Sequence, residues 1–103
     1  MIIEEGYVYH IKNEYFEFVK DEKLMTNYEG DSTRPNYFCI KINDENVMWF
    51  VPMSSKVEKY KKIIQNKMKK YKKCDTIVIG NYRGREHAFL IQNMFPITEK
   101  YID

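Results

Sequence analysis

The chain has 103 residues and a mass of 12.6 kDa, enough for one domain with one modest hydrophobic core and too little for two. Hydrophobic residues make up 44% and charged residues 31%, which excludes an intrinsically disordered chain and a membrane-embedded one. No apolar run approaches the roughly 20 residues of a membrane span, and no signal peptide is recognisable at the N-terminus. We therefore expect a soluble cytoplasmic protein whose two thiols, Cys39 and Cys74, are reduced and serve packing.

The net charge of +2 conceals an uneven distribution. Residues 1–55 carry a net charge of −5, residues 56–73 carry +8 and residues 74–103 carry −1. A basic segment this concentrated is the usual electrostatic signature of a protein that binds a polyanion, with nucleic acid first and an anionic membrane second. The alternative is a simple solvated helix face, but Glu58 is the only acid available for pairing within the run.

The first third of the chain predicts a strand, a helix and a loop. Residues 6–11 alternate and contain aromatic and β-branched residues, which favours a strand. Apolar residues then recur at spacings of three and four, which predicts a helix over residues 13–23 with Asn13 as its N-cap. Residues 26–35 are rich in Gly, Asp, Ser, Asn and Pro and read as a loop, long enough to suggest a function.

The middle of the chain predicts a hairpin followed by the clearest helix. Residues 37–42 and 47–52 are strand-like, and the turn-forming residues 43–46 between them favour antiparallel pairing. Residues 56–73 predict a helix that has one apolar stripe beside a lysine-rich face. The stripe consists of Val57, Tyr60, Ile64, Met68 and Tyr71, of which the two tyrosines read as core residues.

The remaining residues predict three further strands. Residues 76–79 form a buried-type strand, the polar segment 80–85 a tight connection, residues 87–92 a strand, and residues 93–97 an edge strand that tolerates Pro96. No internal repeat is present. The element order β-α-β-β-α-β-β-β predicts an α+β fold, a twisted antiparallel β-barrel or sheet with helices packed on it.

Ser54, Ser55 and Lys56 join the predicted hairpin to the basic helix. Two hydroxyls, an ammonium group and the unpaired N–H groups of a helix start suit the binding of a phosphate group, and could stabilise charge on a phosphorane. The alternative is that Ser54 or Ser55 only caps the helix while Lys56 is solvated.

Other basic side chains are candidates for phosphate contacts. Arg34 could form a two-pronged interaction with a phosphate or stack on a base, or it could simply pair with Asp31 or Glu29 at the surface. Arg83 and Arg85 flank Gly84 in a turn. The lysine-rich face comprises Lys59, Lys61, Lys62, Lys67, Lys69, Lys70, Lys72 and Lys73.

His10 and His87 are the only imidazoles, so either could transfer a proton near neutral pH, although a structural or surface role is the commoner one. The sequence has no metal-binding motif, no phosphate-binding glycine loop and no dinucleotide fingerprint. We therefore expect neither a cofactor nor a metal. Nine tyrosines offer stacking surfaces for bases.

An ordered set of segments resembles the ToxN/AbiQ family, the toxin endoribonucleases of type III toxin–antitoxin systems, with the CptN branch nearest. The segments are Tyr7-Val8-Tyr9 before a short helix, Arg34-Pro35 before a hairpin, Pro52-Met53-Ser54-Ser55-Lys56 at its end, the lysine-rich helix, and a closing Ile91-Gln92-Asn93-Met94-Phe95-Pro96-Ile97. They span nearly the whole chain.

The resemblance implies a MazF/Kid-like barrel that cleaves cellular or phage RNA without a metal and leaves 2′,3′-cyclic phosphate ends. It implies a partner antitoxin made of short pseudoknotted RNA repeats in a closed protein–RNA assembly, with protein–protein contact secondary to RNA bridging. Ser54, Ser55 and Lys56 would hold the scissile phosphate, Arg34 a neighbouring phosphate or base, and His10 or His87 would move a proton. RNA binding would involve Lys59, Lys61, Lys62, Lys69, Lys70, Lys73, Arg83, Arg85 and His87.

Better-known members carry a Pro between the second hydroxyl and the Lys, and they are commonly longer. Here Lys56 follows Ser55 directly, so Lys56 and Lys59 compete as the catalytic ammonium group. Two other functions remain open: a non-catalytic RNA- or DNA-binding module, and a MazF-like nuclease with a protein antitoxin.

Overall fold

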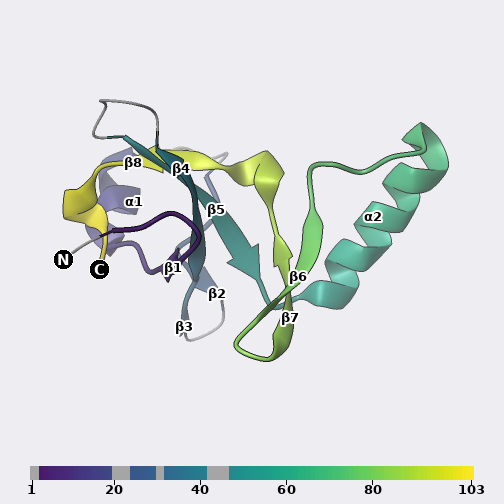
Figure 1. The fold of residues 1–103 in the computed structure, drawn as a ribbon, viewed down its shortest axis with the longest axis horizontal. Helices are drawn as coiled ribbons and strands as arrows, with labels where there is room; N and C mark the ends of the chain where they lie inside the picture. The colour runs from purple at the N-terminus through teal and green to yellow at the C-terminus, as the bar shows by residue number, and fades with distance from the viewer. Residues whose placement is uncertain (1–2, 20–23, 30–31, 42–46) are drawn as a thin grey trace.

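The computed structural model of the chain describes residues 3–19, 24–29, 32–41 and 47–103. These residues form an α+β fold in which a curled antiparallel sheet, a half-barrel, carries two helices (Figure 1). The elements in chain order are β1 (Val8–Tyr9), α1 (Asn13–Val19), β2 (Tyr28–Glu29), β3 (Ser32–Thr33), β4 (Asn36–Lys41), β5 (Met48–Ser54), α2 (Val57–Tyr71), β6 (Val78–Tyr82), β7 (Arg85–Phe89) and β8 (Phe95–Ile97), with 3₁₀ turns at Ile91–Asn93 and Glu99–Tyr101.

Strand β5 is the centre of the sheet. The strand order is β1-β4-β5-β7-β6, and β8 also pairs with β5. One edge of β5 pairs with β4, while its other edge pairs first with β8, where Phe50 faces Phe95, and then with β7, where Met53 faces Phe89. The predicted antiparallel hairpin of β4 and β5 is confirmed, although its turn at residues 43–46 lies outside the described residues.

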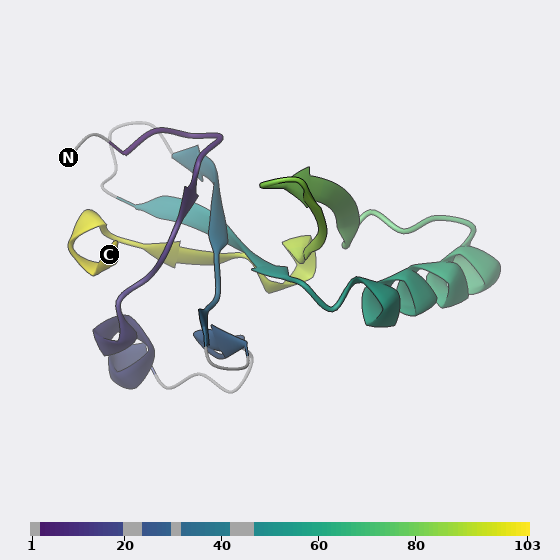
Figure 2. The same cartoon turned by 90° about the horizontal axis from the view of Figure 1, so that it is seen from below.

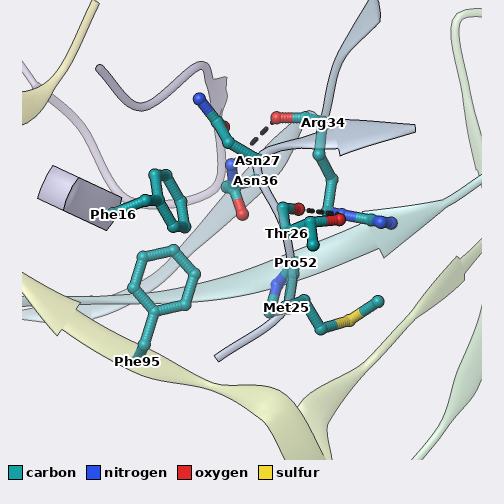
Figure 3. A pocket seen from close by; sticks show the side chains of 8 residues that line it. All are labelled: Phe16, Met25, Thr26, Asn27, Arg34, Asn36, Pro52 and Phe95. Carbon is teal, nitrogen blue, oxygen red and sulfur yellow. Dashed lines mark hydrogen bonds between the residues drawn. The ribbon is translucent and has the colours of Figure 1, made fainter. Parts of the chain in front are cut away.

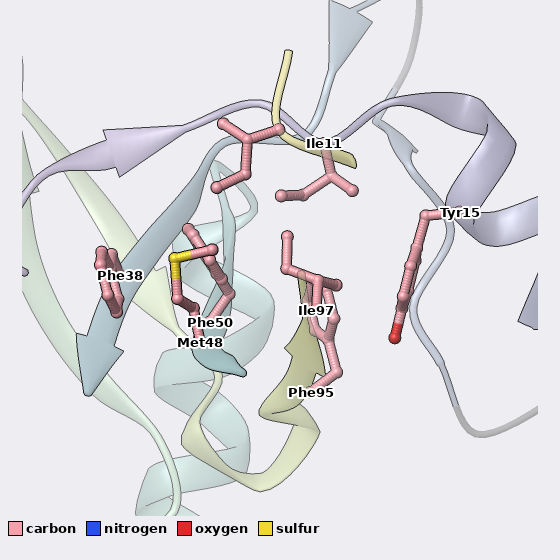
Figure 4. Close-up of a cluster of buried hydrophobic side chains, with 8 residues drawn as sticks. Ile11, Tyr15, Phe38, Met48, Phe50, Phe95 and Ile97 are labelled. Carbon is pink, nitrogen blue, oxygen red and sulfur yellow. The ribbon is translucent and has the colours of Figure 1, made fainter. Parts of the chain in front are cut away.

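The larger of two hydrophobic clusters fills the inside of the curl (Figure 4). Phe50 is fully buried at its centre, where its ring stacks on Phe38 at 5.1 Å and meets Phe95 at 6.5 Å. Residues from both ends of the chain complete this cluster, among them Ile11 and Ile102, which form an isolated β-bridge. Some of the aromatic residues, which make up 16% of the sequence, are therefore core residues.

Helix α2 confirms the clearest element of the sequence, and it lies at one side of the molecule, away from the two termini (Figures 1 and 2). Its first half packs through Tyr60 on a second cluster with Ile77, Ala88 and Leu90. The expectation that Tyr71 is a core residue is wrong, because its side chain is 60% exposed on the last turn of the helix. Only the first half of the apolar stripe meets the sheet.

Several expected boundaries in the first third of the chain are wrong. The strand expected over residues 6–11 is only the two residues of β1, because Gly6 adopts a positive φ of 89° in a turn just before it. Helix α1 begins at Asn13. The Asn13 side-chain oxygen, the atom that a cap would use, accepts from Asn27 Nδ2 at 2.6 Å, and its side-chain amide donates to the Tyr28 hydroxyl at 2.6 Å. The end expected for this helix, residues 20–23, lies outside the described residues.

The segment expected to be a loop over residues 26–35 contains a two-stranded ribbon, formed by the antiparallel strands β2 and β3. Strand β5 also runs two residues further than expected and ends at Ser54. These two differences bring the ribbon beside the end of β5, since Arg34 and Glu29 of the former loop contact Ser54 and Met53.

In the last third of the chain, the strands begin and end at other residues than expected. Strand β6 runs to Tyr82, and a two-residue turn of Arg83 and Gly84, both with positive φ, leads directly into β7. The expected strands over residues 76–79 and 87–92 are therefore displaced, and Val78 is exposed where a buried strand was expected. The ends of these two strands are set by the backbone pairing between β6 and β7, which the local sequence pattern did not predict.

The two cysteines differ in exposure. Cys39 is exposed, so its packing role is wrong, while Cys74 is partly buried and both thiols are free. None of the helices in the described ranges is long and apolar enough to cross a membrane.

We expect Phe50→Ala to lower the free energy of unfolding by about 3–5 kcal/mol, because it leaves a cavity among the rings of Tyr9, Phe38 and Phe95. The matched control is Phe18→Ala, since Phe18 is 79% exposed on α1 and its loss changes stability by no more than about 0.5 kcal/mol. Urea denaturation measures both variants, and equal losses would contradict the assigned core.

Candidate functional site

The candidate site lies where β5 ends and α2 begins. Ser54 is the last residue of β5 and is 2% exposed, whereas Ser55 and Lys56 lie at the surface. The N-cap position of α2 is Lys56, and neither serine caps the helix with its side chain. The part of the alternative in which Ser54 or Ser55 is the N-cap is therefore wrong, whereas its solvent-exposed Lys56 is confirmed. Ser54 Oγ accepts a hydrogen bond of 3.1 Å from the Lys56 N–H, just before the first turn of the helix.

Arg34 is brought to the same place and is buried, with 6% of its surface exposed. Its guanidinium donates from Nε to the Thr26 carbonyl at 3.0 Å (Figure 3) and from Nη1 to the Met53 carbonyl at 2.8 Å. Asn36 Nδ2 also donates to the Arg34 carbonyl at 3.0 Å. Both the backbone and the side chain of Arg34 are therefore held by the fold, and the expected surface arginine is a buried one.

Glu29 is the hub of the cluster, and the sequence did not single it out as a functional residue. Its Oε2 accepts from Ser54 Oγ at 2.6 Å and from Arg34 Nη1 at 3.0 Å. Its Oε1 accepts from the Ser55 N–H at 2.7 Å and also from the Ser55 hydroxyl. The only available signal was its place as one of two acids near Arg34. Of the two pairings offered as alternatives, with Asp31 or with Glu29, the structure has the one with Glu29, although Arg34 is buried and not at the surface.

The same contacts set the charge of Glu29. Burial raises the pKa of this carboxyl, but the hydrogen bonds from Ser54 and Ser55 and the charge of Arg34 outweigh burial and lower the pKa to about 2. Glu29 is therefore an anion at neutral pH and a weak proton acceptor. Chemically, the end of β5 is a site where four donors hold one oxyanion, with a carboxylate in that role.

The structure brings together Arg34, Ser54 and Ser55 of the expected site and leaves Lys56 beside them. Lys56 contributes its backbone N–H, and its exposed side chain enters no ion pair within the described part of the chain. Lys59 lies one helical turn further on, with its ammonium group 5.3 Å from the Tyr60 ring centroid.

The two histidines lie outside this cluster. His10 Nδ1 is 2.8 Å from the Thr33 hydroxyl on β3. The ring of His87 contacts that of Tyr82, and its Nδ1 is 3.2 Å from the Arg85 carbonyl. Because Ala88 pairs with Ser54 on β5, the adjacent His87 points to the opposite face of the sheet.

The lysine-rich face divides into two groups. Lys61 pairs with Glu86 at 3.0 Å, and Lys67 contacts Thr76 Oγ1 at 2.9 Å, so these two ammonium groups bind α2 to the rest of the chain. The Glu86 carboxylate also raises the pKa of Lys61. The other lysines of the face are exposed and form no ion pair within the described ranges: Lys59, Lys62, Lys69, Lys70, Lys72 and Lys73.

Arg83 and Arg85 are exposed at the β6–β7 turn, where the Arg83 guanidinium lies 5.4 Å from the Tyr82 ring centroid. Among the described residues, no three His, Cys, Asp or Glu side chains gather closely enough to hold a metal ion.

Comparison with known proteins adds no assignment. No protein-family model matches the sequence, and no curated protein matches it significantly. The resemblance to the ToxN/AbiQ family stays a prediction.

The fall in stability at acidic pH tests whether Glu29 is the centre of this cluster. Because its pKa in the folded chain, about 2, lies below the usual 4.5, ionised Glu29 stabilises the fold above pH 4.5. That contribution, up to about 3 kcal/mol, is lost as the pH falls from 4.5 towards 2. We therefore expect the unfolding free energy of the natural chain to fall more steeply over this range than that of Glu29→Gln.

Urea denaturation at a series of pH values measures both slopes. Glu86→Gln is the matched control, because it removes a carboxylate from the more exposed Lys61 pair and should leave the acid slope nearly unchanged. Parallel profiles for Glu29→Gln and the natural chain would contradict the assigned hub.

Proposed function

We propose that the protein is a metal-independent endoribonuclease toxin of the ToxN/AbiQ type, with a MazF/Kid-like barrel, acting in the cytoplasm. The single observation that carries this proposal is the convergence of Arg34, Ser54 and Ser55 on one oxyanion at the head of a lysine-rich helix. The anionic oxygens of a phosphodiester can accept hydrogen bonds from these donors as the carboxylate does. The lysines attract the other phosphates of an RNA strand electrostatically.

The reaction would proceed by transfer within the RNA. The 2′-hydroxyl oxygen bonds to the adjacent phosphorus and loses its proton. The bond from phosphorus to the 5′-oxygen of the next nucleotide breaks, and that oxygen takes up a proton. The products are a 2′,3′-cyclic phosphate and a 5′-hydroxyl. Negative charge accumulates on the equatorial oxygens of the phosphorane, so fixed donors that bind them more strongly there than in the ground state accelerate the step.

In this proposal the serine hydroxyls, the Ser55 N–H and Arg34 hold the reacting phosphate in the position of the Glu29 carboxylate. Lys56 or Lys59 supplies the neutralising ammonium group, and Lys56 is the nearer in sequence. His10 and His87, the proton carriers expected from the sequence, contact Thr33 and the Arg85 carbonyl instead of this cluster, so in this arrangement neither is assigned the proton transfer. With its low pKa, ionised Glu29 is a poor base for this step.

The proposed partner is a cognate RNA antitoxin of short pseudoknotted repeats that fills the same site and binds the exposed lysines in a closed assembly. Cellular or phage RNA is the proposed substrate. The wide separation of lysines along α2 suits a backbone with several phosphates better than a single small anion.

A second candidate is a non-catalytic RNA- or DNA-binding module. It is favoured by one observation: Ser54 and Ser55 are already hydrogen-bonded to Glu29, as expected for a structural tie between the ribbon and β5. Binding would then depend on the lysines alone and produce no cleavage products.

Cleavage assays separate these functions. We expect Ser55→Ala and Lys56→Ala each to lower the cleavage rate of a defined RNA by about 10²–10³-fold, because each removes stabilisation of the phosphorane. The natural chain should stay active in excess chelator and leave 2′,3′-cyclic phosphate and 5′-hydroxyl ends. Lys100→Ala is the control for charge, since Lys100 lies against Tyr101 near the C-terminus. Undiminished cleavage in both variants would contradict the assigned site.

Salt dependence tests the lysine face. The triple variant Lys69→Gln, Lys70→Gln, Lys73→Gln should reduce the slope of log K against log salt for single-stranded RNA, by about 0.7 for each phosphate that is no longer neutralised. The control triple Lys12→Gln, Lys41→Gln, Lys100→Gln changes the net charge equally at sites off α2 and should leave the slope nearly intact. Equal effects of the two triples would mean that only net charge matters.

A further inference from the structure

The anion site at the end of β5 is filled by an acid of the chain itself. Both carboxylate oxygens of Glu29 are used, one by Ser54 and Arg34 and the other by Ser55. A second anion cannot accept from these donors while Glu29 holds them, and it would also face the charge of the carboxylate across a short distance. Any phosphate that binds here must therefore displace Glu29.

The fold presents Glu29 from a ribbon with several attachments. Strand β2 pairs with β3 through Glu29–Ser32 and Tyr28–Thr33. The Tyr28 hydroxyl accepts from Asn13 on α1, and Thr33 contacts His10. Because these attachments hold the backbone of Glu29, its carboxylate competes for the donors as a tethered group with a high effective concentration.

From this geometry we infer that Glu29 is a specificity-determining residue, an internal anion that excludes free phosphate from the site and yields only to a polyanion. The inference rests on the proposed function in taking RNA as that polyanion. It assigns to Glu29 a role that neither the sequence pattern nor the catalytic proposal requires.

The selectivity follows from the number of contacts that each competitor makes. Free phosphate gains only the donors that it takes from Glu29, so the exchange brings little benefit. An RNA strand that places one phosphate in the site can place others against the exposed lysines of α2, which form no ion pair with any acid among the described residues. The surface position of Ser55 lets the displaced carboxylate turn towards solvent, and Lys56 beside it offers a new partner.

Phosphate binding to Glu29→Gln tests the inference directly. The neutral amide keeps the shape of the side chain but gives up the charge that holds Arg34 and both serines. We expect titration with inorganic phosphate to shift the backbone amide signal of Ser55 in Glu29→Gln, with an affinity at least about tenfold above that of the natural chain. The same titration should raise the melting temperature of Glu29→Gln more than that of the natural chain.

Two controls accompany this titration. Glu86→Gln removes a carboxylate that contacts no group of the site and should behave like the natural chain. The double variant Glu29→Gln, Ser55→Ala should lose the gained affinity, because it lacks a donor hydroxyl. Equal phosphate affinity in Glu29→Gln and the natural chain would overturn the inference.

A second measurement needs no substitution. In the natural chain, a single-stranded RNA 12-mer should shift the Ser55 amide, while inorganic phosphate at the same total phosphate concentration should not. Equal responses to both ligands would overturn the selectivity, even if Glu29→Gln failed to fold.

The outcome is separable from that of the proposed function. RNA cleavage by the natural chain without any gain of phosphate affinity in Glu29→Gln would sustain the nuclease and overturn the role of Glu29. A gain of phosphate affinity in Glu29→Gln, in a protein that neither binds nor cleaves RNA, would support the competition between Glu29 and phosphate. It would contradict both the proposed nuclease activity and the assignment of RNA as the displacing polyanion.

Discussion

The whole molecule depends on the pairing of β5 with strands on both of its edges. Phe50 lies in the first half of β5 and is buried against rings from β4 and β8. This half of the strand therefore forms part of the larger hydrophobic cluster. The second half of β5 changes partner to β7 and thereby carries α2 and its cluster. A strand that is hydrogen-bonded on both edges cannot shift in register without breaking both sets of hydrogen bonds. The residues at its end, Ser54 and Ser55, therefore have a fixed place.

This rigid strand end explains why a buried arginine is tolerated there. An unpaired guanidinium in a site that excludes water would cost several kcal/mol, so Arg34 requires carbonyl oxygens and a counter-charge. The Met53 carbonyl at the end of β5 and the Thr26 carbonyl supply the first, and Glu29 supplies the second. The site is accordingly a balanced cluster of one cation and one anion with neutral donors, and not a bare positive patch.

The lysines of α2 place further positive charge next to this cluster. Within α2, Lys61 and Lys67 attach the helix to the rest of the chain, while the more distal lysines extend into solvent with the exposed Met68 and Tyr71. Under the proposed function, the exposed lysines of α2 would contact an extended RNA strand while one of its phosphates enters the site at the end of β5. The helix would then supply affinity, and Glu29 would supply selectivity.

The sequence by itself determined the elements whose signals are local. The period of the apolar residues predicted α2, and strand-like residues on either side of the turn-forming residues 43–46 predicted β4 and β5. The count of lysines located the positive charge. Ser54, Ser55 and Arg34 were identifiable as candidates because their side chains are strong donors next to an element boundary. The expected pairing of Arg34 with a nearby acid was also a local inference.

Only the tertiary structure decided what these donors bind. Glu29 reaches Ser54 and Ser55 across 25 and 26 residues of sequence, through a ribbon that the composition of residues 26–35 predicted as a loop. Tyr71 continues the apolar stripe of α2 and still lies in solvent, because the helix is buried against the second cluster through Tyr60 and not through its last turn. The spacing of apolar residues in one segment indicates which side chains share a face. Which residues pack against that face depends on how distant segments pair, and a local sequence pattern does not encode this pairing.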